Sequence, residues 1–133
     1  MCLILFAYKM QKSTSLIVAA NRDEFYTRPT HAAHYWGKYP ELLAGKDLEA
    51  GGIWLGATKT GRFSAVTNLA ETAPIEAPIS RGGLALDFLT GDRDAHSYAD
   101  TLIKNRYQGF NLLLLTASPC CMLQTVSNPT FPI

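Results

Sequence analysis

Two short apolar runs at the N-terminus, separated by a polar connection, constrain the fold of this chain most. The runs are Leu3–Tyr8 and Ser15–Ala20, and the polar box Asn21–Glu24 follows directly. Two such runs joined by a few polar residues predict a β-hairpin. Their unbroken apolar character also predicts strands that are buried on both faces. Because a hairpin brings the end of its second strand beside the start of its first, Cys2 is expected to lie next to the polar box.

A second hairpin is predicted in the middle of the chain. Its strands are residues 51–57 and 62–68, and the turn between them contains Gly61, which can adopt a positive φ. By contrast, residues 25–40 are rich in aromatic residues, proline and histidine without a clean period, and are predicted to be irregular. Residues 70–78 carry two prolines and are expected to form a mobile loop.

The remaining part of the chain predicts two helices followed by two strands. A helix is expected over 81–89 with Ser80 as its N-cap, and a second one over 94–103, where apolar residues recur with helical periodicity. Strands are predicted at 110–116 and 121–126. This order of strands, helices and strands favours an α+β fold with helices layered on a mainly antiparallel sheet.

Length and charge restrict the functions that the chain could have. Its 133 residues are enough for a single domain, 1–133, with a substantial core. Twelve basic and eleven acidic residues give a formal charge of +1, so we expect no nucleic-acid binding. The longest apolar runs are far shorter than a bilayer span of about 20 residues, so no membrane insertion is expected.

Cysteine usage points to a reducing compartment. The three cysteines, Cys2, Cys120 and Cys121, make an odd number, and the adjacent pair is poorly placed to form a bridge without strain. Together with the absence of a signal-peptide pattern, this predicts a cytoplasmic protein. His31 and His34 have no acidic or thiol partner nearby in the sequence, so neither a metal nor another cofactor is expected.

Cys2 is the candidate nucleophile. Removal of Met1 would give this cysteine its own free α-amino group, whose pKa of about 7.7–8.0 suits it to accept the thiol proton. Nucleophile and base would then belong to one residue, as in N-terminal-nucleophile enzymes. Taken alone, Cys2 fits a small buried apolar residue that happens to follow the initiator better than it fits a nucleophile.

The polar box and Asn68 supply the other candidate site residues. Asp23 could orient an amine, Arg22 could hold a thiolate or a substrate carboxylate, and Glu24 could support both. A polar turn with a local ion pair is the alternative for these three residues. Asn68 ends a predicted strand, where its amide could donate to a developing oxyanion or serve only as a turn residue.

A series of short motifs runs in order along the chain as far as about Leu115. They are Met1-Cys2, Ala19–Pro29, Tyr35–Gly37, Ala44–Asp47, Gly51–Gly56, Ala65–Asn68, Ser80–Gly82 and Gly109–Leu113. Taken together, these motifs closely resemble the NRDE family, the group that includes transport and Golgi organisation protein 2.

The resemblance implies an N-terminal-nucleophile hydrolase-like fold, a layered αββα sandwich of two stacked sheets between helical layers. Related cysteine amidohydrolases of that fold act on penicillin V and bile salts. They use an N-terminal cysteine, an aspartate after the second strand and a strand-end asparagine, which correspond here to Cys2, Asp23 and Asn68. Arg22 is the candidate for the arginine that precedes their aspartate. Since family members are longer, we expect a sandwich truncated at its C-terminal side, whose uncovered face would favour a homo-oligomer.

Two functions stay open at this point. The first is a cysteine N-terminal-nucleophile amidohydrolase that acts on a non-peptide C–N (amide) bond of a small molecule. The second follows from the biology of the resembled family and is a non-catalytic factor that handles haem or a lipid acyl chain in trafficking. The expected partner is therefore a small-molecule amide or an apolar ligand.

Overall fold

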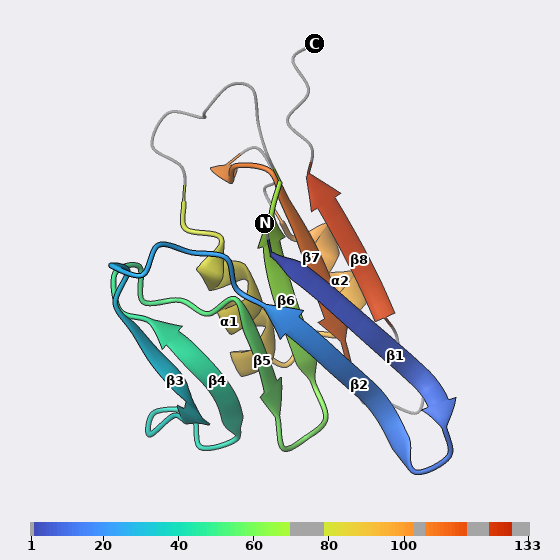
Figure 1. Ribbon diagram of the computed structural model, residues 1–133. Coiled ribbons are helices and arrows are strands. Elements are labelled where there is room, and N and C mark those ends of the chain that lie inside the picture. The colour runs from blue at the N-terminus through green and yellow to red at the C-terminus, as the bar shows by residue number, and fades with distance from the viewer. Residues whose placement is uncertain (1, 70–78, 103–105, 117–122, 129–133) are drawn as a thin grey trace.

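The computed structural model describes residues 2–69, 79–102, 106–116 and 123–128 (Figure 1). Its strands and helices, in chain order, are β1 (Leu3–Gln11), β2 (Thr14–Asn21), β3 (Thr30–Tyr35), β4 (Leu42–Asp47), β5 (Leu55–Thr58), β6 (Phe63–Asn68), α1 (Gly82–Thr90), α2 (Ala95–Asp100), β7 (Phe110–Leu115) and β8 (Leu123–Asn128). No helix in the described ranges has the length and apolar character needed to cross a membrane.

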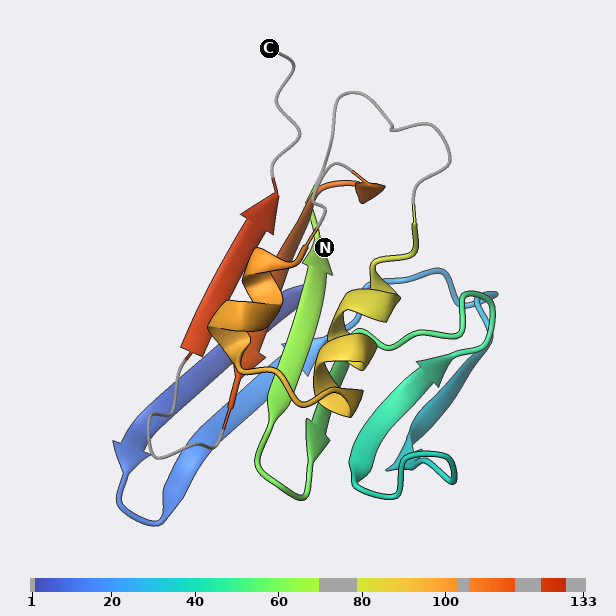
Figure 2. The ribbon, with the colours of Figure 1, turned by 180° about the vertical axis from the view of Figure 1, so that it is seen from behind.

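The described elements form three layers. Strands β3 to β8 make one antiparallel sheet in which neighbours in space are also neighbours in sequence, and β1 pairs with β2 in a separate antiparallel ribbon. The ribbon crosses the front of the six-stranded sheet in Figure 1, and both helices lie behind that sheet, nearer the viewer in Figure 2. The predicted α+β fold with helices layered on an antiparallel sheet is therefore confirmed. Within the described residues, no helix covers the outer face of the ribbon.

Strand β7 is buried on both faces of the six-stranded sheet. Its sequence is an unbroken apolar run, and alternate residues point to opposite faces. Phe110, Leu112 and Leu114 are fully buried in the core on the helix side, whereas Leu113 and Leu115 belong to the cluster beneath the ribbon. An unbroken apolar run thus marks a strand covered on both faces at this position.

Helix α1 closes the core on the helix side. It buries Leu84, Ala85, Phe88 and Leu89 against the sheet, and the hydroxyl of Tyr98 in α2 donates to the carbonyl of Leu84 at 2.8 Å. The Phe88 and Tyr98 rings lie 5.4 Å apart, so the two helices share one core. Burial raises the pKa of Tyr98, which keeps this hydroxyl protonated as a donor.

The first two strands differ from the prediction in their burial. The hairpin itself is confirmed, with Leu3 opposite Asn21, but only one face of it is covered. Its inner face packs against the six-stranded sheet through four side chains, Ile4, Tyr8, Leu16 and Val18. On the outer face Leu3, Leu5 and Ile17 are 53%, 60% and 45% exposed. The prediction that these strands are buried on both faces is therefore wrong, because the described residues supply no layer above the ribbon.

The segment predicted to be irregular contains a strand. Residues Thr30–Tyr35 form β3 at the edge of the sheet, and β4, which the pattern did not indicate, pairs with it. Every residue of β3 is exposed, so its sequence shows no alternation that could have revealed it. The second hairpin is confirmed, although β5 begins only at Leu55, and Gly61 has the expected positive φ of 82°.

Both helices are confirmed with shifted ends. The N-cap of α1 is Arg81 rather than Ser80, and no side chain caps it. Helix α2 ends at Asp100, and its N-cap Asp94 accepts a hydrogen bond from the Ser97 backbone N–H. The predicted loop at 70–78 and three other singled-out residues, Ile103, Cys120 and Cys121, lie outside the described residues.

Candidate active site

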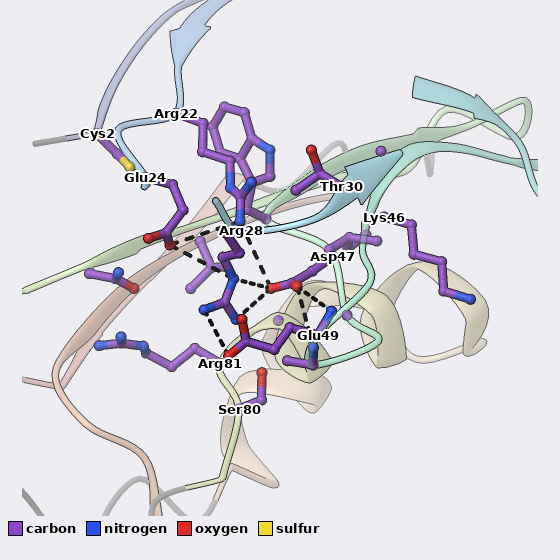
Figure 3. A pocket seen from close by; sticks show the side chains of 18 of the residues that line it. Cys2, Arg22, Glu24, Arg28, Thr30, Lys46, Asp47, Glu49, Ser80 and Arg81 are labelled. Atoms are coloured by element: carbon purple, nitrogen blue, oxygen red, sulfur yellow. Dashed lines mark hydrogen bonds and ion pairs between the residues drawn. The ribbon is translucent and has the colours of Figure 1, made fainter. Parts of the chain in front are cut away.

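Five residues that the sequence gave a candidate role line one cavity of about 560 Å³. They are Cys2, Arg22, Asp23, Glu24 and Asn68 (Figure 3 labels Cys2, Arg22 and Glu24). The ribbon pairing explains part of this arrangement, since Leu3 lies opposite Asn21 and the residues flanking that pair leave the ribbon at the same end. The predicted proximity of Cys2 to the polar box is confirmed.

Cys2 is a half-buried free thiol held against the box by the backbone. The N–H of Asp23 donates to Cys2 Sγ at 3.3 Å, and Sγ lies 4.0 Å from the Asp23 carbonyl oxygen. The Leu3 N–H donates to Asn21 Oδ1 at 3.0 Å, which fixes the chain on the other side of the thiol. A backbone N–H that faces the sulfur offers a hydrogen bond to a thiolate.

Arg22 faces carboxylates. Its Nη2 lies 3.9 Å from Glu24 Oε2 and 3.8 Å from Asp47 Oδ2, and its side chain is 23% exposed. The local ion pair that the sequence left open is therefore present. Arg22 also contributes to the lining of the cavity.

A second arginine, Arg28, makes the shortest ion pair among the described residues of the site. Its Nε and Nη2 donate to the same oxygen of Asp47, Oδ2, at 3.0 and 2.8 Å, and its Nη1 reaches Glu49 at 3.4 Å (Figure 3). Glu24 also lies 4.0 Å from Arg28. Sequence reasoning assigned no role to Arg28 or Asp47, although both belong to the motifs of the resemblance. Because they are far apart in the chain, no local pattern could pair them.

Asp47 is held by its surroundings in the ionised form. Its Oδ1 accepts the backbone N–H groups of Glu49 and Ala50 at 3.0 and 3.3 Å. Burial alone raises the pKa of Asp47, but the hydrogen bonds from Arg28 and from these two N–H groups outweigh burial and leave the pKa below its ordinary value. The same contact with Asp47 raises the pKa of Arg28.

The rest of the cavity wall mixes polar and apolar groups. Asn68, at the end of β6, and Trp54 and Val66 line it on the sheet side. Arg81, at the start of α1, also lines it and donates to the Gly109 carbonyl at 2.9 Å. Among the described residues, no three His, Cys, Asp or Glu side chains gather as metal ligands.

Comparison with known proteins identifies the family. The sequence model described as Transport and Golgi organisation 2 matches residues 1–132. The chain is 39% identical to the mouse protein "Transport and Golgi organization 2 homolog" and 40% identical to the cattle protein "Transport and Golgi organization protein 2 homolog". Each match extends over 122 residues, which are 85% of this chain and 44% of the relative. The Drosophila melanogaster protein "Transport and Golgi organization protein 2" is 32% identical, over 96% of this chain and 51% of its own length. The chain thus spans about half the length of these relatives. It belongs to the Transport and Golgi organisation 2 family.

Proposed function

We propose that this chain is a cysteine N-terminal-nucleophile amidohydrolase acting on a non-peptide amide bond of a small molecule. One observation carries the proposal. A half-buried thiol at the second residue accepts an N–H from Asp23 at 3.3 Å, in the same cavity as Arg22 and Asn68. A thiol nucleophile and an amide donor for the oxyanion are groups that acyl transfer from an amide uses, and a nearby carboxylate can orient the base.

The reaction begins once Met1 has been removed. The α-amine of Cys2 takes the thiol proton, and the thiolate attacks the amide carbonyl carbon. The Asn68 amide and a backbone N–H stabilise the negative oxygen of the tetrahedral intermediate. The C–N bond then breaks, the protonated α-amine returns its proton to the leaving amine, and a thioester stays on Cys2. Water hydrolyses this thioester and regenerates the thiol.

The polar box takes supporting roles in this scheme. The Asp23 carboxylate orients the α-amine, and Arg22 contacts the thiolate or an acidic group of the substrate. Glu24 supports Arg22, from which it lies 3.9 Å away. We also propose that the single domain is part of a four-layer αββα sandwich in which a further layer covers the ribbon. Exposed Leu3, Leu5 and Ile17 support that part of the proposal, and also the homo-oligomer as one way to cover them.

Acylation by a lactam tests the proposed function. The purified protein is incubated with penicillin V, and the adduct is located by peptide mass spectrometry. We expect a protein that begins at Cys2 and carries one penicilloyl group on that residue. C2A should take none, while the matched control with both Cys120→Ser and Cys121→Ser should react like the native protein. An intact Met1, or equal labelling of C2A and the native protein, would exclude the mechanism.

A second candidate function rests on a different observation. Phe25 and Tyr26 follow the polar box directly and are 81% and 108% exposed, which is unusual for adjacent aromatic side chains. They suit a non-catalytic factor that binds an apolar ligand such as haem or an acyl chain. A haem titration checks this candidate. A shifted Soret band that is lost in the double variant F25S/Y26S would support it, and an unshifted band would reject haem as the ligand.

A further inference from the structure

The Asp47 carboxylate connects two parts of the chain that meet at the cavity. Its Oδ2 accepts both Arg28 hydrogen bonds and lies 3.8 Å from Arg22 Nη2. Its Oδ1 accepts the backbone N–H groups of Glu49 and Ala50. One oxygen therefore binds the connection between β2 and β3, and the other binds the turn after β4.

The turn that Asp47 caps is itself fixed. The Gly51 N–H donates to the Asp47 carbonyl at 2.9 Å, and the Asp47 N–H donates to the Gly52 carbonyl at 3.0 Å. Gly51 has a φ of 75°, a conformation that favours glycine. Ile53 donates to the Gly82 carbonyl at 3.2 Å, and a Cβ on Gly52 would lie 2.6 Å from the Gly82 carbonyl carbon. The turn is thus anchored to the first residue of α1 and forms a rigid support.

The connection held by this support leads directly to the thiol. Arg22 and Glu24 flank Asp23 in the sequence, and the Asp23 N–H is the group that donates to Cys2 Sγ. Arg22 lies near Asp47, and Glu24 lies 4.0 Å from Arg28. Both flanking side chains are therefore tied to the Arg28–Asp47 pair, whose side chains are only 25% and 18% exposed. Because two N–H groups of Arg28 donate to the same Asp47 oxygen, the pair constrains the orientation of the guanidinium as well as its distance.

We propose that Asp47 and Arg28 are positioning residues that hold the Asn21–Glu24 box so that the Asp23 N–H meets Cys2 Sγ. Neither residue takes part in bond making or breaking. Their importance for catalysis rests on the proposed function, whereas their effect on the geometry around Cys2 does not. Residues that orient a reacting group in this way change its reactivity without touching the substrate themselves.

The test compares D47N with D47E and with a distant carboxylate variant. The matched control is E41Q, because Glu41 pairs with Lys59 at 3.8 Å on an exposed surface remote from the cavity. Two quantities are measured, the amide resonance of Asp23 in a proton–nitrogen correlation spectrum and the rate of Cys2 alkylation by iodoacetamide at pH 7. We expect D47N to move the Asp23 resonance and to slow alkylation by about tenfold, because the Cys2 thiolate loses the hydrogen bond from the Asp23 N–H. D47E should restore both in part, and E41Q should change neither.

A second variant keeps the test decisive if D47N does not fold. R28K retains the charge and loses the two-pronged contact, so the same two changes are expected from it. Native values of both quantities in folded D47N or R28K would overturn the proposal. Lactam acylation separates this inference from the proposed function. A native protein that is never acylated, with the Asp23 resonance still moved in D47N, rejects the function and keeps the positioning role. If native protein and D47N are both acylated at the same rate, with the Asp23 resonance unmoved in D47N, the function is kept and the positioning role is rejected.

Discussion

The Cys2 sulfur and the Asp47 carboxylate each accept hydrogen bonds from backbone N–H groups. Asp23 supplies the donor to Cys2, and Glu49 and Ala50 supply the donors to Asp47. Such donors are placed by the local course of the chain, so each acceptor depends on the conformation of a short segment. At the scale of single residues, the chemistry of this site is set by turns as much as by side-chain identity.

The pKa of Asp47 makes part of the stability depend on pH. Since its pKa is lowered in the folded protein, its contribution is present above its unfolded value of about 3.9 and is lost as the pH falls through the lower folded value. We expect D47N to reduce the free energy of unfolding at pH 7. The difference from the native protein should shrink as the pH falls below about 4. Urea denaturation at pH 7 and pH 3 measures both differences, and an equal difference at the two values would contradict this account.

At the scale of elements, the turn after β4 and the start of α1 approach too closely for a side chain. A Cβ on Gly52 would lie 2.6 to 2.9 Å from three backbone atoms of Gly82, which cannot move independently of the helix. Gly83, one position further along α1, has no neighbouring atom within 4 Å of such a Cβ. Gly83 is therefore a suitable control for Gly52, because a Cβ fits at Gly83 and does not fit at Gly52.

Substitution of this pair by alanine should have opposite effects. Gly52→Ala should lower the free energy of unfolding by about 3 kcal/mol through overpacking. Gly83→Ala should raise it by about 0.5–1 kcal/mol, because alanine favours the helix. Urea denaturation of both variants checks the contrast. Equal stabilities would show that the close approach of the turn and the helix does not exist in solution.

Neighbouring residues of β2 test the packing of the ribbon on the sheet. Val18 packs against the cluster beneath the ribbon, whereas Ile17 is 45% exposed on the other face. Val18→Ala should lower the free energy of unfolding by about 1–2 kcal/mol, and Ile17→Ala by less than about 1 kcal/mol. A larger loss for Ile17→Ala, measured by the same denaturation method, would indicate that the outer face is covered in solution.

The sequence predicted elements whose signals are local. Both hairpins, both helices and the strand at β7 follow from apolar runs, turn residues and helical periodicity. The exposed edge strand β3 has no such signal, because alternation arises only when one face of a strand is buried. The two faces of the ribbon could not be told apart for a related reason. Leu3 and Leu5 are as apolar as Ile4, and only the position of the six-stranded sheet decides which side is covered.

At the scale of the whole molecule, the cavity lies where the three layers meet. The ribbon and the connection after it supply Cys2 and the polar box, the sheet supplies Asn68 and Asp47, and the start of α1 supplies Arg81. The proximity of Cys2 to the box could be predicted because both belong to one hairpin. The Arg28–Asp47 pair could not be predicted, since it requires the relative placement of β3 and β4.

In the proposed mechanism the thiol and the α-amine of Cys2 act together, which can be tested by releasing the α-amine in a controlled step. The chain is fused behind a removable domain whose protease leaves Cys2 as the first residue, and penicillin V acylation is followed by mass spectrometry before and after cleavage. Before cleavage the thiol is present but its α-amine is bound in a peptide. We predict that the penicilloyl group forms on Cys2 only after cleavage. Equal acylation before and after cleavage, or none after it, would contradict the claim.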